Sequence, residues 1–277
     1  MYVIAELGSN WQDLNDVLTA VREVSEAGAQ ALKIQYFRAD TLYSKERALN
    51  LYAAAKRYEF LQEWLPVVAR ECEKHGLDFG ASVFSPGDVD VLLPYVKFFK
   101  IASGDILNRL LIDAVYKTEK QVFISTGAAT NDEILNVSKL YPDAVMMACV
   151  SKYPARVEDY RLGLGDLVEG VIGLSDHTVN GLSKYEYFMD EHYDLACYAI
   201  AYGYTFFEKH FRPFSLKNKT PDYGHSVDKV GLSNYIYYLN RVKSLFENRE
   251  LTPEEEKERL WARRGKDGLR PNEEVHE

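Results

Sequence analysis

The chain has 277 residues, of which 47% are hydrophobic and 27% charged, which is typical of a globular protein. A net charge of −9 argues against nucleic acid as a partner, and no apolar run of about 18 residues indicates a membrane span. The three cysteines, Cys72, Cys149 and Cys197, are too far apart for a zinc or disulfide framework, so we expect a cytoplasmic protein with reduced thiols.

Short runs typical of β-strands alternate along the chain with longer segments in which apolar residues have helical spacing. Residues 14–28 have this helical pattern and end in Gly28, a residue that favours the C-terminal cap of a helix. Residues 60–76 have it too, but Pro66 predicts either a kink or a later start, and the last long helix is expected at 229–247. The eight strands are expected at residues 2–8, 31–36, 78–84, 98–103, 121–127, 145–151, 170–176 and 205–211.

This alternation predicts βαβ units and a parallel sheet. Eight repeats favour a closed (β/α)8 barrel, or TIM barrel, of the α/β class. An open dinucleotide-binding sheet is disfavoured, because no G-x-G-x-x-G follows the first strand. We expect one barrel domain over residues 1–249 and a charged C-terminal extension over 250–277, in which glutamates 254–256 lie in the first turn of a helix.

Polar residues end each predicted strand, although strands covered on both faces should be almost entirely apolar. A charged residue in such a strand costs several kcal/mol unless it is paired or used. The C-terminal strand ends form the functional face of a TIM barrel. Since side chains alternate along a strand, Lys33 can face the same way as Gln35, and Glu208 the same way as His210. We therefore expect a polar pocket at this face.

His177 and His210 end the last two predicted strands. Adjacent strands lie about 4.8 Å apart, so both imidazoles can reach one divalent metal ion, with Asp176 or Glu208 as a further ligand or as the acceptor that fixes a histidine tautomer. Such ligands do not select strongly among Mn²⁺, Co²⁺, Fe²⁺ and Zn²⁺. The alternative is that both are hydrogen-bonded core histidines.

Lys33 and Lys100 form a second candidate cluster, because both lie within otherwise apolar runs that neighbour serine-rich strand ends. Two ammonium groups with several hydroxyls suit the charge and hydrogen bonding of a phosphate group. Alternatively, each lysine pairs with Glu6 or Asp105 inside the barrel, or one forms a Schiff base, chemistry that a neighbouring metal makes unnecessary.

Eight motifs follow one another along the chain in the order that a known family has. They are AELGSN (5–10), LKIQ (32–35), FKIASGD (99–105), ISTGAAT (124–130), CVSKYPA (149–155), IGLSDHT (172–178), FFEKHF (206–211) and TPDYGHS (220–226). Through them, residues 3–264 resemble the sialic acid synthase family, including its pseudaminic and legionaminic acid relatives. The resemblance implies a TIM barrel that condenses phosphoenolpyruvate with the open-chain aldehyde of an N-acetylated sugar, giving a 2-keto-3-deoxy sugar acid and phosphate.

The resemblance also implies residue roles. Glu6, His177 and His210 are expected to be catalytic, and the two histidines to bind a divalent metal, Mn²⁺ before Mg²⁺ or Co²⁺. Phosphoenolpyruvate binding is expected of Lys33, Ser82, Lys100, Ser103, Ser125 and Ser175, and sugar binding of Gln35, Asp105, Ser151, Tyr153 and Asp222. The expected partners are these small molecules and a second copy of the chain in a homodimer, with no membrane.

The departures from the family pattern concern mainly the sugar side. Asp105 stands where the family has glutamate, and Ser151 where it has asparagine. Residues 181–195 look like an insertion that forms a lid or a longer helix, and residues 250–268 resemble the linker to the family's C-terminal antifreeze-like domain, which this sequence lacks. Two alternatives therefore stay open, the same chemistry on another aldehyde and a sugar-binding barrel without activity.

Overall fold

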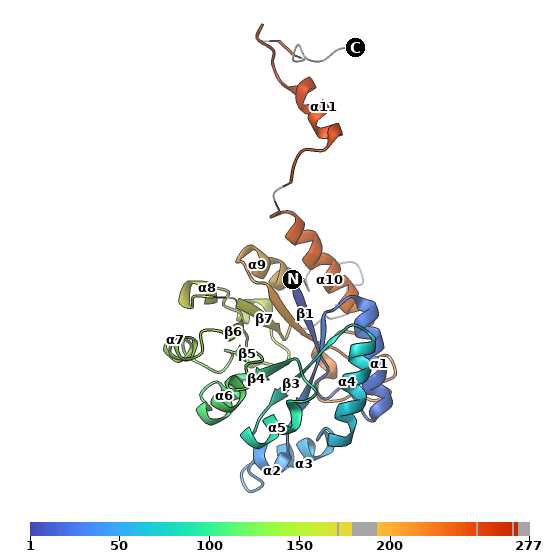
Figure 1. The fold of residues 1–277 in the computed structure, drawn as a ribbon, viewed down its shortest axis with the longest axis vertical. Coiled ribbons are helices and arrows are strands. Elements are labelled where there is room, and N and C mark those ends of the chain that lie inside the picture. Colours follow the sequence, from blue (N-terminus) through green and yellow to red (C-terminus); the bar gives the residue numbers. More distant parts are fainter. Residues whose placement is uncertain (171, 179–192, 248, 268, 271–277) are drawn as a thin grey trace. The chain divides into compact units, whose positions relative to one another are not determined.

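The computed structural model describes residues 1–170, 172–178, 193–247, 249–267 and 269–270. Its eight parallel strands follow one another around a closed barrel, which is completed where β8 pairs with β1, and helices surround them (Figure 1). This confirms the predicted (β/α)8 barrel. The strands are β1 (Tyr2–Glu6), β2 (Ala31–Tyr36), β3 (Asp78–Val83), β4 (Phe98–Ile101), β5 (Gln121–Ser125), β6 (Val145–Ala148), β7 (Ile172–Asp176) and β8 (Phe206–His210).

The barrel unit comprises Met1–Val242, and Lys243–Glu277 form a second unit. No helix in the described part of the chain is long and apolar enough to span a membrane. The helices are α1 (Leu14–Ala27), α2 (Ala39–Leu42), α3 (Leu49–Arg57), α4 (Leu65–Lys74), α5 (Val89–Leu92), α6 (Arg109–Tyr116), α7 (Asn131–Leu140), α8 (Leu164–Leu167), α9 (Asp194–Ala201), α10 (Lys229–Ser244) and α11 (Pro253–Ala262). Single 3-10 turns are η1 (Gln62–Trp64), η2 (Pro86–Asp88), η3 (Ser103–Asp105), η4 (Val157–Asp159) and η5 (Tyr223–His225).

Several strands end one to three residues before their expected ends. Ser103 consequently belongs to η3, and Tyr153 to the loop after β6. Helix α4 begins at Leu65 with Pro66 in its first turn, because proline lacks the amide hydrogen that later turns require. Gly28 caps α1 in the left-handed conformation, with φ 90°, as its position predicted.

Aromatic and aliphatic side chains fill the N-terminal end of the barrel interior. The rings of Phe98 and Phe123 meet edge to face with centroids 5.2 Å apart, and Ile4 and Met147 pack in the same layer. A Cβ atom on Gly80 would lie 2.1 Å from the Phe98 ring, so the glycine makes room for this layer. The interior therefore has an apolar floor, and only its C-terminal half is polar.

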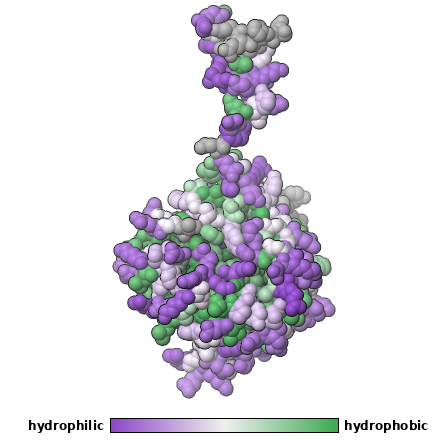
Figure 2. All heavy atoms as spheres, in the orientation of Figure 1, coloured by the Kyte–Doolittle hydropathy of each residue, from purple (hydrophilic) through white to green (hydrophobic). Residues whose placement is uncertain are grey.

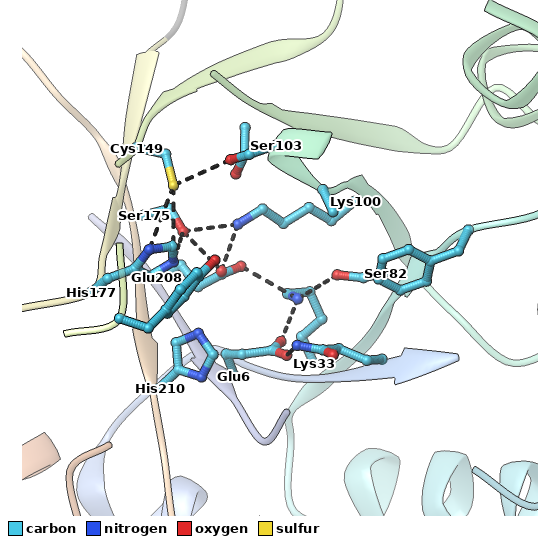
Figure 3. Close-up of a pocket in the computed structure, with 15 residues that line it drawn as sticks. Glu6, Lys33, Ser82, Lys100, Ser103, Cys149, Ser175, His177, Glu208 and His210 are labelled. Carbon is cyan, nitrogen blue, oxygen red and sulfur yellow. Dashed lines mark hydrogen bonds and ion pairs between the residues drawn. The ribbon is translucent and has the colours of Figure 1, made fainter. Parts of the chain in front are cut away.

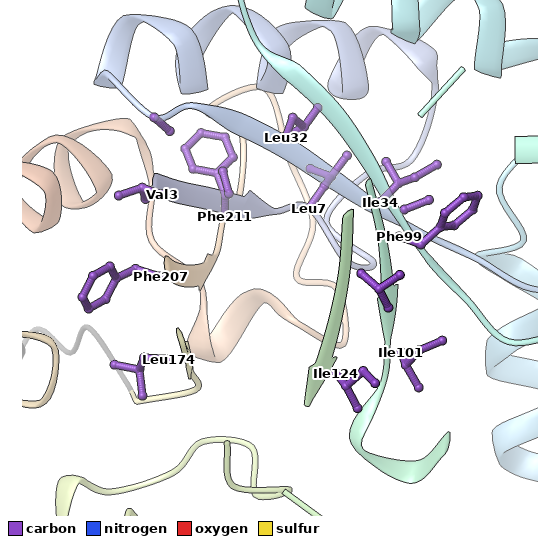
Figure 4. Packing of buried hydrophobic residues seen from close by; sticks show 14 of the residues in the cluster. Val3, Leu7, Leu32, Ile34, Phe99, Ile101, Ile124, Leu174, Phe207 and Phe211 are labelled. Carbon is purple, nitrogen blue, oxygen red and sulfur yellow. The ribbon is translucent and has the colours of Figure 1, made fainter. Parts of the chain in front are cut away.

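The outward-facing side chains of the strands pack beneath the helices, where Leu32, Ile34, Phe99 and Phe207 are fully buried (Figure 4). Helix α10 buries Leu232, Tyr235, Ile236 and Leu239 on one face, whereas its Tyr237 is exposed. Hydrophilic residues predominate at the rim of the barrel unit in Figure 2.

The helix of the second unit begins as its glutamates predicted. Thr252 and Glu255 form a capping box at the start of α11, and Glu254 and Glu256 share its first turn with Glu255. No residue of α11 is buried. Its stability therefore comes from local capping and ion pairs, such as that of Arg249 with Glu255, rather than from a core.

Candidate active site

The C-terminal strand ends enclose one polar cavity (Figure 3). All eight strands, or the residues directly after them, contribute to it, because inward-facing positions alternate along each strand. Its lining consists of Glu6, Lys33, Gln35, Ser82, Phe84, Lys100, Ala102, Ser103, Ser125, Cys149, Tyr153, Ser175, His177, Glu208 and His210. Eleven of these were predicted as site residues from the sequence.

Lys33 occupies the side of the cavity formed by β1, β2 and β3. Its Nζ forms an ion pair with Glu6, donates to Ser82 Oγ at 2.6 Å and lies 3.7 Å from Glu208 Oε2. Burial opposes the charge on Lys33, but the carboxylates of Glu208 and Glu6 outweigh it and raise the pKa of the amine. Burial also raises the pKa of Glu6. Lys33 is therefore a firmly held cation beside a carboxyl group that accepts a proton readily.

Lys100 occupies the opposite side of the same network. Its Nζ lies 2.5 Å from Glu208 Oε1 and donates to Ser175 Oγ at 3.1 Å. Burial opposes ionisation of Glu208, but Lys100 and Lys33 outweigh it and lower the pKa of Glu208 to about 2. Glu208 thus bridges the two lysines, so it is not placed as an acceptor for a histidine. The alternative pairing of a lysine with Glu6 occurs at Lys33, whereas Asp105 instead accepts from Asn108.

Hydroxyl and amide groups complete this half of the cavity. The amide of Gly127 donates to Ser103 Oγ at 3.2 Å, and a Cβ atom on Gly127 would lie 2.9 Å from that oxygen. Ser125 Oγ is buried without a hydrogen-bond partner. A buried polar atom without a partner is costly, so Ser125 offers a free hydroxyl to a bound anion.

The two predicted histidines lie side by side, with ring centroids 5.4 Å apart. His177 Nδ1 lies 2.8 Å from the carbonyl oxygen of Val150, a contact that leaves Nε2 to face the cavity. His210 Nδ1 is buried and has no hydrogen-bond partner. Burial and the neighbouring His177 and His225 hold the pKa of His210 well below its usual value. A neutral imidazole with a free nitrogen is what a divalent metal requires.

Cys149 lies beside His177, and its Sγ is 3.8 Å from Nδ1 of that ring. Burial opposes the thiolate, but His177 and Lys100 outweigh burial and lower the pKa of Cys149 to about 7. Burial likewise opposes the imidazolium of His177, but Cys149 raises the pKa of this histidine. The sequence had given Cys149 no role. Cys149 follows Met147 of β6 by two positions, so its side chain points into the barrel as that of Met147 does.

A third imidazole approaches from the loop after β8. His225 has its ring centroid 4.5 Å from that of His210, and Asp222 lies next to both. One ligand atom from each of His210, Asp222 and His225 lies within 4.8 Å of the other two. This donor set of imidazole nitrogen and carboxylate oxygen fits a divalent transition metal. His225 was not among the metal ligands predicted from the sequence.

A second cavity of about 250 Å³ opens beside the first and shares Gln35 and Phe84 with it. Its other lining residues include Phe37, Leu42 and Tyr43, which are largely apolar, and Asp222. Asp222 is thus the third predicted sugar-binding residue, after Gln35 and Tyr153, to line one of these two cavities.

Two predicted sugar-binding residues, Asp105 and Ser151, line neither of these cavities. Asp176 requires a correction, because it faces outward and lies 3.0 Å from Lys209 Nζ, with both side chains fully buried. It follows inward-facing Ser175, so strand alternation turns it away from any ion at His177. Residues 181–192 of the expected insertion lie outside the described part of the chain.

Comparisons with known proteins identify a family for this chain. The sequence model of the NeuB family matches residues 20–250. A pseudaminic acid synthase of Helicobacter pylori is 29% identical, over 94% of this chain and 81% of its own. An N,N'-diacetyllegionaminic acid synthase of Campylobacter jejuni is 30% identical, over 87% of this chain and 76% of its own.

Solved structures share the fold. The N-acetylneuraminic acid synthetase of Leptospira borgpetersenii, solved with citrate, superimposes with a TM-score of 0.80 at 24% identity, covering 93% of this chain and 89% of its own. A truncated 3-deoxy-D-arabino-heptulosonate 7-phosphate synthase of Thermotoga maritima gives a TM-score of 0.66 at 13% identity, covering 89% and 87%.

Proposed function

Because the chain belongs to the NeuB family, we propose that it condenses phosphoenolpyruvate with the open-chain aldehyde of an N-acetylated sugar in a metal-dependent reaction. The enzyme class is a transferase that forms a carbon–carbon bond. The observation that carries the proposal is that Lys33 and Lys100 line the same cavity as His177 and His210. One pocket thus offers a place for an anion beside a place for a divalent cation.

The lysine side of the cavity suits phosphoenolpyruvate. Lys33 and Lys100 supply charged N–H donors, and Ser82, Ser125 and Ser175 supply hydroxyl groups, one of them free of any protein partner. Charge-assisted hydrogen bonds of this kind hold carboxylate and phosphate oxygens tightly. Ser103, which accepts from the Gly127 amide, extends the same surface.

The charges in the cavity also support metal dependence. Glu6 and Glu208 neutralise the two lysines, so the network has no surplus charge to offset that of phosphoenolpyruvate. A divalent metal at His177 and His210, with Mn²⁺ the expected ion, would supply that surplus. When bound there, it would polarise the aldehyde oxygen of the acceptor, an effect worth several kcal/mol.

The protein's part in the reaction is then to position the two substrates and to transfer protons. With phosphoenolpyruvate held by the lysines, its enol methylene carbon attacks the aldehyde carbon and forms the new bond. The aldehyde oxygen becomes an alkoxide that takes up a proton from solvent, and C2 becomes an electrophilic oxocarbenium carbon. Water adds to C2, and Glu6, whose raised pKa suits a proton acceptor, takes the proton of that water. The bond between C2 and the phosphate oxygen then breaks, releasing phosphate and the 2-keto acid. Placing both substrates in one pocket supplies much of the acceleration.

The second cavity bears on the acceptor. It adjoins Gln35 and is largely apolar, so we expect an acceptor with apolar substituents, such as N-acetyl or methyl groups. Gln35 lines both cavities, and its Nε2 donates to Glu6 Oε1 at 3.0 Å, which supports a role for this amide in holding the acceptor. The acceptors whose products are pseudaminic or legionaminic acid fit this description. Sugar contacts from Asp105, Ser151 and Asp222 stay predictions.

The test is an acceptor panel. Purified protein with Mn²⁺, phosphoenolpyruvate and a series of mono- and di-N-acetylated hexoses is expected to release inorganic phosphate with at least one of them. Mass spectrometry should then detect the matching 2-keto acid. Removal of the metal with a chelator should abolish release, and adding Mn²⁺ back should restore it.

A matched pair of lysine variants controls this assay. Lys100→Met is expected to lower kcat/KM at least 100-fold, about 2.7 kcal/mol of transition-state stabilisation. Lys97→Met, an exposed residue three positions earlier that lines another cavity, should have no effect. If metal-replete protein releases no phosphate with any acceptor, the proposal is wrong, and the alternative of a sugar-binding barrel without activity takes its place.

A further inference from the structure

His225 is a buried imidazole that the proposed reaction does not use. It lies in η5 (Tyr223–His225) and is 4% exposed. Its Nε2 is buried and has no hydrogen-bond partner, and the nearest carboxylate oxygen, Asp222 Oδ1, lies 3.6 Å away. Leaving such a nitrogen without a hydrogen-bond partner is unfavourable. His210 Nδ1 is also buried without a hydrogen-bond partner, so each of these two adjacent imidazoles has one nitrogen that no hydrogen bond satisfies.

The spacing of the rings suits one shared ion. With metal–nitrogen bonds of about 2.1 Å, imidazoles on one ion have centroids about 4.6 Å apart at right angles and about 6.5 Å apart when opposite. The centroid separations are 4.5 Å for His210 and His225, 5.4 Å for His177 and His210, and 6.5 Å for His177 and His225. The separations of 5.4 and 6.5 Å fall in that range, and that of 4.5 Å lies at its lower limit.

Asp222 adds a carboxylate at the same place. Its Oδ2 accepts from the amide of Ser9 at 2.7 Å, and the backbone amide of Asp222 donates to Ser9 Oγ at 3.1 Å. Gly8 makes this approach possible: it has φ 54°, and a Cβ atom there would lie 2.2 Å from Asp222 Oδ2. The loop after β1 therefore holds the carboxylate beside His210.

The η5 turn itself is firmly placed. Buried Asn10 donates to Ser226 Oγ at 2.7 Å and to the Phe211 carbonyl at 2.8 Å, and Arg212 donates to the carbonyl of Ser226. Side chains already fixed by their surroundings bind a metal with little loss of conformational entropy. The free nitrogen of His225 is thus held beside His210 before any ion arrives.

We propose that His225, together with one carboxylate oxygen of Asp222, joins His177 and His210 as a protein ligand of the divalent metal ion. The inference rests on the proposed function only because it concerns the same metal ion that the proposed reaction uses. It assigns Asp222 to the ion in place of a sugar hydroxyl group. Four protein ligands leave two positions of an octahedral ion for exchangeable oxygen ligands, and the nitrogen-rich set favours Mn²⁺, Co²⁺ or Zn²⁺ over Mg²⁺.

The experiment measures metal binding without turnover. Chelator-stripped protein is titrated with Mn²⁺ by isothermal calorimetry, and the visible spectrum of the Co²⁺ form is recorded. His225→Ala is expected to weaken Mn²⁺ binding at least tenfold and to change the Co²⁺ spectrum. Asp222→Asn, which keeps an acceptor for Ser9, should also weaken binding. His75→Ala is the matched control, since His75 ends α4 and contacts Glu71; it should leave both readouts unchanged.

The outcomes separate this inference from the proposed function. Circular dichroism of each variant confirms that it is folded. The inference is overturned if folded His225→Ala binds Mn²⁺ within twofold of the affinity of the unmodified protein and has an unchanged Co²⁺ spectrum. It is also overturned if the unmodified protein binds none of these ions. If the unmodified protein binds metal through His225 but releases no phosphate with any acceptor, the inference stands and the proposed function fails.

Discussion

At the scale of single residues, the cavity holds charges that a packed core would not tolerate. Glu6, Lys33, Lys100 and Glu208 are all nearly inaccessible to solvent, and each forms an ion pair with another member of this group. Removing one partner of such a network leaves an uncompensated buried charge. The network is therefore more consistent with a binding site than with a packed core. Substituting any one of its members is expected to lower stability as well.

Asp105 is half-buried and lies outside the network of two lysines and two glutamates, so it allows the cost of partly burying a carboxylate to be measured. Burial raises its pKa above 3.8, although the hydrogen bond from Asn108 partly opposes the shift. The folded state then binds a proton more tightly than the unfolded chain. The contribution of Asp105 to the free energy of unfolding therefore falls as the pH rises from 3.8 through the higher folded-state pKa.

Asp105→Asn should consequently raise the free energy of unfolding at pH 7, and the gain should shrink as the pH falls toward about 4. Urea denaturation of both proteins across this range measures the difference. Asp90→Asn, at an exposed aspartate, should change little at either pH. A gain for Asp105→Asn that did not depend on pH would refute this account of its burial.

At the scale of elements, strands β7 and β8 show how alternation separates function from structure. Ser175, His177, Glu208 and His210 face the cavity. The intervening Asp176 and Lys209 face the helices and pair with each other, and Lys209 also donates to the carbonyl of Thr178 at 2.8 Å. A buried ion pair between two adjacent strands thus lies directly behind the histidines.

Lys209→Met should destabilise the fold by about 3–5 kcal/mol, because it leaves Asp176 charged and buried. Lys152→Met, which breaks the exposed pair with Asp159, should cost no more than about 1 kcal/mol. Combining Lys209→Met with Asp176→Leu should cost less than the two single changes together. Chemical denaturation of the four variants measures these terms. Strict additivity would mean that the pair is not coupled.

At the scale of the whole molecule, barrel closure decides which distant segments meet. The pairing of β8 with β1 sets Glu6 opposite His210, although 203 residues separate them in the sequence. The two units contribute unequally to the core, since the barrel unit contains the buried clusters and α11 contains no buried residue. We propose that residues 1–249 are sufficient for folding.

A variant that ends at Arg249 should therefore melt within about 2 °C of the full chain. A change of 1 kcal/mol shifts Tm by about 2–4 °C in a protein of this size, and α11 has no buried side chain to lose. A variant that ends at Asp228 is the control, because it also removes Leu232, Tyr235 and Leu239 of α10 and should not fold. Scanning calorimetry measures both. A loss of more than about 4 °C on removing 250–277 would contradict the proposal.

The sequence by itself determined the barrel and most of the inward-facing polar residues. Strand and helix periodicities are local properties of the chain, and parallel strands in a barrel bring their C-terminal ends to one face. Motifs such as SDHT and EKHF then indicated the family before any contact was known.

Only the tertiary structure decided which of these residues are partners. Glu208 lies between two lysines rather than beside a histidine, Asp176 faces outward to Lys209, and His225 reaches His210 from a loop. Such pairings depend on the stagger between strands and on the path of loops after them. Both are set by the packing of segments far apart in the chain, and neither has a local period that a sequence can display.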